Sequence, residues 1–184
     1  MRVIAGTAKK TKLIAPKGVA VRPTGDRVKE ALFNILGLSV VDCSFLDLFA
    51  GTGSVGIEAL SRGAGRAVFV EQEKSNMPII HKNLQVTGLE KKAECMCLPV
   101  SEAIPLLGTE KRLFEFVFMD PPYSQNLVLG VFHCLRSHAI VAPGGVLVVE
   151  SGRKDLPPET GTGAIQLLRR ERYGDTVLSF YQFQ

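Results

Sequence analysis

The chain has 184 residues, of which 46% are hydrophobic and 22% are charged. This balance is typical of one soluble globular domain and excludes a disordered or fibrous chain. No apolar stretch approaches the ~18 residues of a membrane helix, and the first residues lack the apolar core of a signal peptide. The four cysteines form no C-x-x-C pair and have no histidine at metal-binding spacing, which indicates free thiols in a reducing cytoplasm and no metal site.

Positive charge is concentrated at the N-terminus. Residues 1–30, the basic leader, contain eight basic and two acidic residues, a net charge of +6, which leaves −2 for the other 154 residues. Within the leader we expect two short strands, at 1–5 and 11–15, that form a hairpin over 6–10. The charge fits a polyanionic partner and fits a solvated surface arm equally well.

A helix is expected next, from Asp26, whose side chain would cap it, to Leu36, with an apolar face at i, i+3, i+4 and i+7. Strand and helix patterns then alternate along the chain. Pro143–Gly145 would form the turn into the fifth strand. Strands are expected near 44–49, 66–71, 93–98, 114–119 and 145–151, and helices near 54–62, 75–87, 101–107 and 126–138.

The strands are near-continuous apolar runs, as in a parallel sheet that is covered on both faces. Their alternation with helices predicts an α/β fold with right-handed crossovers and a doubly wound, mostly parallel sheet. A closing antiparallel hairpin at 164–173 and 176–183 brings this sheet to seven strands. We expect an N-terminal extension over 1–37, a core over 38–184, and a loop rich in glycine and proline over 152–163.

The first functional pattern follows the strand that ends at Phe49. Gly51, Gly53 and Gly56 fit the spacing G-x-G-x-x-G between a strand and a helix. Glycine lets the backbone approach a ligand closely. Glu71 ends the next strand, 20 residues after Gly51, where a carboxylate can accept hydrogen bonds from two ribose hydroxyls. This half of the chain therefore predicts a site for a nucleoside-containing cofactor.

The second pattern, Asp120-Pro121-Pro122-Tyr123, follows a strand-like apolar run. The two prolines remove backbone donors and stiffen the turn, so it offers carbonyl and carboxylate acceptors beside an aromatic ring. Such a corner suits a planar group that carries an NH2 group; a purely structural turn, with Tyr123 as a lid on the core, is the alternative. Because ligands bind at the carboxyl ends of strands in an open α/β sheet, this corner, the glycine turn and Glu71 are expected to converge on one crevice.

Several segments resemble those of the class I S-adenosylmethionine-dependent methyltransferases, which have a Rossmann-like fold, namely Ala50-Gly51-Thr52-Gly53, Glu71 and Asp120–Tyr123. The last motif has the form associated with methylation of exocyclic or amide nitrogens. The N-terminal part resembles the bacterial family that methylates N2 of guanine in 16S ribosomal RNA of the small subunit. The segments that carry this second resemblance are Arg2–Gly6, Arg22-Pro23-Thr24 and Asp26–Leu36.

The resemblance implies a monomeric enzyme with S-adenosylmethionine as its cofactor. Its implied substrate is ribosomal RNA within a partly assembled small subunit. The residues implied to bind the cofactor are Asp47, Phe49, Ala50, Gly51, Thr52, Gly53, Glu71 and Asp120. The catalytic corner is implied to comprise Asp120, Pro121, Pro122 and Tyr123, whose ring would stack on the target base. Contacts with RNA are implied for Tyr123, Arg22, Thr24, Arg27, Asn34, Lys9, Lys10 and Lys12. For Asp47 a hydrogen bond to the glycine-turn backbone is an equal alternative, and for the polar residues of 22–34 the alternative is capping and salt bridging.

The sequence departs from this family in two places. After the third strand, where such enzymes carry an acid for the adenine amine, residues 97–101 contain none, so backbone groups or Ser101 are expected there. The hairpin also lacks a glycine near Lys10. Other functions stay open: N-methylation of DNA adenine or protein glutamine, a non-catalytic role in RNA binding and assembly, or a dinucleotide-dependent oxidoreductase. The histidines fall on predicted helices, away from the carboxyl edge, which counts against the last of these.

Overall fold

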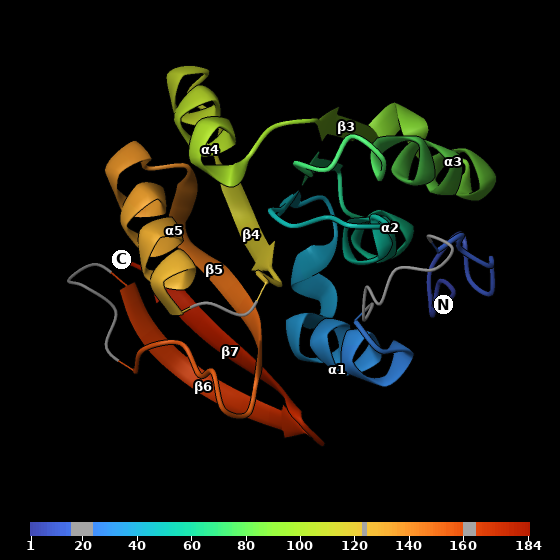
Figure 1. The fold of residues 1–184 in the computed structure, drawn as a ribbon. Helices are drawn as coiled ribbons and strands as arrows, with labels where there is room; N and C mark the ends of the chain where they lie inside the picture. Colours follow the sequence, from blue (N-terminus) through green and yellow to red (C-terminus); the bar gives the residue numbers. More distant parts are fainter. Residues whose placement is uncertain (16–23, 123–124, 160–164) are drawn as a thin grey trace.

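The computed structural model describes residues 1–15, 24–122, 125–159 and 165–184. Its strands form a seven-stranded sheet in the order β3-β2-β1-β4-β5-β7-β6 (Figure 1). The strands β1 to β5 are parallel, and β7 is antiparallel to both β5 and β6. The predicted doubly wound, mostly parallel sheet is therefore confirmed. The strands are β1 (Ser44–Asp47), β2 (Arg66–Val70), β3 (Ala93–Met96), β4 (Phe114–Met119), β5 (Val141–Gly152), β6 (Ile165–Tyr173) and β7 (Thr176–Phe183).

Helices cover both faces of the sheet (Figure 1). Residues of α1, α2 and α3 pack in one apolar cluster, and residues of α4 and α5 pack in another on the opposite face. Along β1, Phe45 belongs to the first cluster and Leu46 to the second, which is why this strand is apolar throughout. None of the described helices is long and apolar enough to cross a membrane. The helices are α1 (Asp26–Leu36), η1 (Gly37–Val40), α2 (Ser54–Ser61), α3 (Met77–Thr87), η2 (Glu90–Lys92), α4 (Val100–Thr109) and α5 (Gln125–His138).

The spacing of the glycines after β1 has a steric origin. Gly53 takes a left-handed φ of 77° at the position directly before α2. A methyl group at Gly56 would stand 2.3 Å from the ring of Phe69 on β2. The helix α2 therefore lies so close to β2 that only glycine fits at the contact, as the third glycine of this motif requires.

The N-terminal hairpin is less regular than expected. Instead of two regular strands, the segments 1–5 and 11–15 share one isolated bridge, between Arg2 and Lys12, and backbone hydrogen bonds such as that from the Val3 N–H to the Thr11 carbonyl at 3.0 Å. The chain reverses through a short series of turns in which Lys10 takes a left-handed φ of 71°, a conformation that glycine adopts more readily. Tight turns in so short a segment leave little extended backbone for a ladder.

The helix α1 has the predicted bounds but a different cap. Gly25 is its N-cap, without a side-chain hydrogen bond, and Asp26 is already helical. The predicted capping by Asp26 is therefore wrong. Its carboxylate instead lies 3.5 Å from the Arg2 guanidinium of the leader.

The strand β5 begins earlier than expected, at Val141, and the predicted turn lies within it as a bulge, in which Gly144 takes a left-handed φ of 75°. Its pairing with β4 shifts register between Phe114 and Phe116. Such an irregularity interrupts the hydrogen-bond ladder, which lets a proline stand within a strand. The loop predicted over 152–163 lies partly outside the described residues; 153–159 form neither helix nor strand.

Candidate active site at the carboxyl edge of the sheet

A small cavity of about 50 Å³ lies at the carboxyl edge of the sheet. It brings together three segments that are distant in sequence: the glycine turn after β1, the residue after β4, and the residue that precedes the cap of α1. The structure thus places the glycine turn beside the first residue of the acid-diproline corner. Among the residues that line the cavity are Thr24, Phe49, Ala50, Gly51, Thr52 and Asp120.

Glu71 braces the glycine turn from the neighbouring strand β2. Its Oε2 accepts a hydrogen bond from the Gly51 N–H at 2.7 Å, and its Oε1 accepts one from the Glu73 N–H at 2.7 Å. The side chain is 8% exposed. Each carboxylate oxygen has a second acceptor position, so the group can still receive two donors from a ligand. The backbone bonds fix its orientation in advance.

Asp47 ends β1 at the same cavity and is 1% exposed. Its Oδ2 accepts a hydrogen bond from the Gly56 N–H at 3.1 Å, whereas its Oδ1 has no hydrogen-bond partner within the described residues. Burial, aided by the negative charges of Glu71 and Glu150, raises the pKa of Asp47 to about 7. A buried carboxylate with one unsatisfied oxygen suits a cationic ligand group, because a nearby positive charge favours the ionised form.

The acid-diproline corner is described as far as Pro122. Asp120 is half-buried at the cavity wall, Pro121 is buried and Pro122 is exposed. Tyr123 lies outside the described residues, so its stacking on a base stays a prediction. The described part of the corner supplies a carboxylate at the cavity that the glycine turn also lines.

A second cavity, of about 340 Å³, adjoins the first at Phe49, which lines both. Pro99, Val100 and Pro122 give it apolar walls, and Ser101 adds a hydroxyl. A flat heteroaromatic ring suits apolar walls with a few polar groups at the rim. No acid is among the residues that line this cavity in the described part of the chain.

Several residues at or beside these cavities were not predicted from the sequence. Gln72 lines the second cavity. It directly follows Glu71, and this position after the acid that ends a strand could have indicated it as a site residue. Val131 lies on the apolar face of α5 and also lines that cavity. Glu150 was missed as well: it is buried near the end of β5, and its Oε2 accepts a hydrogen bond from the Thr24 hydroxyl at 2.7 Å. An acid at the end of the fifth apolar run was the pattern that could have indicated it.

The remaining predicted substrate residues are spread over the surface. Lys9, Lys10 and Lys12 are exposed in the leader, and Arg27 is exposed on α1. Asn34 lines a different surface hollow, near the C-terminal end of α1. Thr24 is the one predicted RNA-contacting residue, among those described, that lines the 50 Å³ cavity. Arg22 lies outside the described residues.

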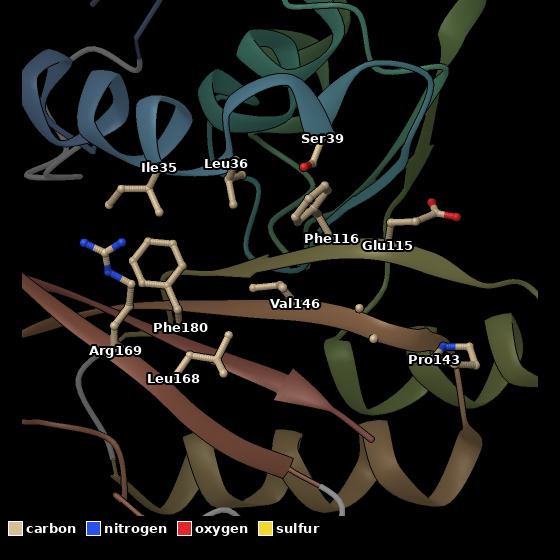
Figure 2. A pocket seen from close by; sticks show the side chains of 12 residues that line it. Ile35, Leu36, Ser39, Glu115, Phe116, Pro143, Val146, Leu168, Arg169 and Phe180 are labelled. Atoms are coloured by element: carbon tan, nitrogen blue, oxygen red, sulfur yellow. The ribbon is translucent and has the colours of Figure 1, made fainter.

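A larger hollow, of about 410 Å³, lies elsewhere on the molecule, between η1 and the antiparallel end of the sheet (Figure 2). Ile35, Phe116 and Phe180 give it mainly apolar walls. The carboxylate of Glu115, which also lines it, accepts a hydrogen bond from the Ser44 N–H at 2.7 Å. Because the glycine turn, Glu71 and Asp120 do not line this hollow, it is not the candidate active site.

Comparison with known proteins places this architecture in a family. The family model described as "Conserved hypothetical protein 95" matches residues 1–182. The chain belongs to this family. The ribosomal RNA small subunit methyltransferase D of Haemophilus influenzae is 35% identical over 185 residues, covering 99% of this chain and 93% of the relative. The solved structure of yhhF from Escherichia coli has a TM-score of 0.87 and 30% identity, covering 100% of this chain and 98% of that one.

A more distant structure shares the fold alone. The RNA methyltransferase from Salinibacter ruber, solved in complex with S-adenosyl-L-homocysteine, has a TM-score of 0.68 at 16% identity and covers 88% of this chain and 93% of that one. The comparisons confirm the resemblance to the small-subunit rRNA methyltransferase family and its Rossmann-like methyltransferase fold. They count against an oxidoreductase.

Proposed function

We propose that this protein transfers a methyl group from S-adenosylmethionine to the exocyclic N2 of a guanine in 16S ribosomal RNA. The observation that carries the proposal is that the glycine turn and Asp120 line one cavity. The names of the relatives support ribosomal RNA as the substrate. The choice of guanine N2 rests on the resemblance of the corner and the leader to enzymes of that specificity.

The residues present fit this cofactor. Its ammonium group would meet the unsatisfied Oδ1 of Asp47, and its ribose hydroxyls would meet the remaining acceptor positions of Glu71. The adenine ring would occupy the second cavity, with Ser101 in place of the acid that related enzymes carry. When bound, the cofactor supplies a methyl group on a positively charged sulfur, which leaves as a neutral thioether.

The corner would orient the target amine. The lone pair of a guanine amine is delocalised into the ring, so the nitrogen is a weak nucleophile. Acceptors at Asp120 and the Pro121 carbonyl would hold the two N–H groups and turn the lone pair toward the methyl group, an alignment that supplies much of the acceleration. The Asp120 carboxylate would also stabilise the positive charge that develops on nitrogen. Because the leaving group is neutral, no general acid is needed, and one proton leaves the methylated nitrogen after the transfer.

The base and its RNA would be held from outside the cavity. Tyr123 would stack on the unpaired or flipped guanine, a contact worth roughly 1–3 kcal/mol. Arg22, Thr24 and Arg27 would contact the RNA beside the site, and Asn34 would contact it at the hollow near the C-terminal end of α1. The exposed Lys9, Lys10 and Lys12 would meet phosphates, each contact steepening the salt dependence of binding.

We expect Asp120→Ala to lower methyl transfer by at least about 100-fold, the scale on which one electrostatic stabiliser acts, while cofactor binding persists. The protein and this variant are incubated with tritiated S-adenosylmethionine and ribosomal RNA, partly assembled small subunits, DNA or protein, and the labelled product is identified. Calorimetry with S-adenosylmethionine is the control for an intact site. Label in N2-methylguanine supports the proposal. Label in adenine or glutamine would contradict the assigned substrate, and full activity of the variant would contradict the role of Asp120.

A further inference from the structure

Residues 1–14 lie beside α2 and α3 (Figure 1), and buried polar side chains hold them there, among them three on these two helices. Glu58 on α2 accepts hydrogen bonds from two backbone N–H groups of this segment, at 2.8 and 3.0 Å. Ser61, at the end of α2, donates to one of its carbonyls at 2.6 Å and accepts from the Ala8 N–H at 3.0 Å. The contact is close, since a methyl group at Gly6 would stand 1.7 Å from the Ser61 carbonyl oxygen.

The third side chain, Asn83 on α3, is fully buried and makes three hydrogen bonds. Its Oδ1 accepts from the Ile14 N–H at 2.7 Å, and its Nδ2 donates to the Ile14 carbonyl at 3.0 Å and to the Thr52 carbonyl at 2.9 Å. Both donors of the amide are used and its oxygen is bonded, so the group has one orientation that satisfies it. A side chain of this kind fixes the backbone segments on either side of it relative to each other.

Those two segments belong to different parts of the proposed site. Thr52 is in the glycine turn and lines the cavity together with Asp120. Ile14 is in the basic leader, two residues after Lys12. The start of the leader also reaches the turn, since the Thr52 hydroxyl lies 3.4 Å from the Met1 sulfur. Within the described residues, the side chains of Glu58 and Ser61 make no hydrogen bond to the glycine turn, so Asn83 differs from these two anchors in joining the leader to the cofactor loop.

We propose that Asn83 is a positioning residue that couples RNA binding by the leader to cofactor binding in the glycine turn. This inference rests on the proposed function. Phosphate contacts at the exposed lysines restrain the leader, the cofactor restrains the turn, and the buried amide of Asn83 transmits each restraint to the other. The ligand that binds first orders both the leader and the turn. The second ligand then has less of the backbone to order, so the two ligands bind cooperatively. Such coupling is reciprocal by thermodynamic linkage.

The test measures a coupling factor, which is the factor by which one ligand changes the affinity of the protein for the other. The affinity of the full chain for a 16S ribosomal RNA fragment is measured with and without saturating S-adenosylhomocysteine, and the affinity for S-adenosylhomocysteine is measured with and without the RNA. For the wild type we expect each ligand to tighten the other by the same factor, at least about fivefold. In Asn83→Asp, which keeps the acceptor for the Ile14 N–H and loses the donors to the two carbonyls, the factor falls to about one.

Ser61→Ala is the matched control, because it removes an equally buried anchor of the same segment without touching the turn. We expect it to keep the wild-type coupling factor even where it weakens RNA binding. A merely structural role of Asn83 would lower both affinities and leave their ratio unchanged. If Asn83→Asp does not fold, Asn83→Leu, which removes all three hydrogen bonds at similar volume, is measured in the same way.

The outcomes separate the two proposals. A coupling factor that is retained in the Asn83 variant, or lost equally in Ser61→Ala, overturns the inference. So does a wild-type protein that binds both ligands independently, although the proposed function then stands. Failure of the wild type to bind or methylate ribosomal RNA overturns the proposed function itself.

Discussion

The ionisation of Asp47 affects the stability of the folded chain, and the same carboxylate is proposed to bind the cofactor. In the folded protein this carboxyl keeps its proton up to about pH 7, whereas its ordinary pKa is 3.8. Between these two pH values the folded state binds more protons than the unfolded state, so the contribution of Asp47 to the free energy of unfolding falls as pH rises. A shift of this size corresponds to about 4 kcal/mol as an upper bound.

We predict that Asp47→Asn increases the free energy of unfolding of the cofactor-free protein relative to wild type above pH 7, by roughly 1–4 kcal/mol. The difference should shrink as the pH falls toward 3.8, where the folded carboxyl is neutral and the unfolded one is about half protonated. Urea unfolding followed at pH 4, 6 and 8 measures it. A difference that does not change with pH would contradict the buried, ionisation-dependent cost. The same substitution should weaken S-adenosylmethionine binding, because the ammonium group loses its charged partner.

At the residue scale, the sequence predicted which residues lie near one another better than it predicted their contacts. The glycine spacing and strand-ending acid placed Gly51 and Glu71 correctly beside each other, because both follow strands that end at one edge. The hydrogen bond that Glu71 accepts from the glycine turn was not foreseen. For Asp47, one oxygen accepts a hydrogen bond from the Gly56 N–H in the first turn of α2, and contact of the other oxygen with the cofactor stays a prediction. Hydrogen-bond partners depend on distances in the folded protein, which the spacing of residues in the sequence does not give.

At the scale of elements, the contact between α2 and β2 sets where the glycine turn stands. We predict that Gly56→Ala destabilises the protein by about 1–3 kcal/mol, because the added methyl group cannot stand 2.3 Å from the Phe69 ring without displacing α2. Gly130→Ala on α5 is the control: a methyl group there meets no atom within 4 Å, and alanine should stabilise the helix by up to about 1 kcal/mol. Urea unfolding of both variants provides the comparison. Equal effects would contradict the steric account of the motif.

The helices and strands of the core were predicted to within a few residues, since long apolar runs and helical periodicity are local properties of the chain. The leader was predicted less well. Its expected hairpin is reduced to one bridge and a few backbone hydrogen bonds, and side chains of α2 and α3, such as Glu58 and Asn83, also hold the segment in place. The start of β5 was misplaced for a related reason: a register shift that accommodates Pro143 is a property of the sheet.

At the scale of the whole molecule, the fold brings together groups that no sequence pattern links. The hydrogen bond between Thr24 and Glu150 spans 126 residues and joins the segment before α1 to the end of β5, beside the cavity that the glycine turn also lines. The order of strands determines this meeting, and the alternation of strands and helices alone does not specify that order. The expectation that the leader lies at the site came from the resemblance to a known family, because the periodicity of the sequence does not indicate it.

The central claim is that one crevice holds the methyl donor and the target amine side by side. A crystal structure of the protein with S-adenosylhomocysteine tests it most directly. The account predicts density for adenine in the 340 Å³ cavity beside Ser101, ribose at Glu71, and the sulfur in the 50 Å³ cavity, facing Asp120. Density for the ligand in another hollow of the molecule, or a sulfur that faces away from Asp120, would contradict it.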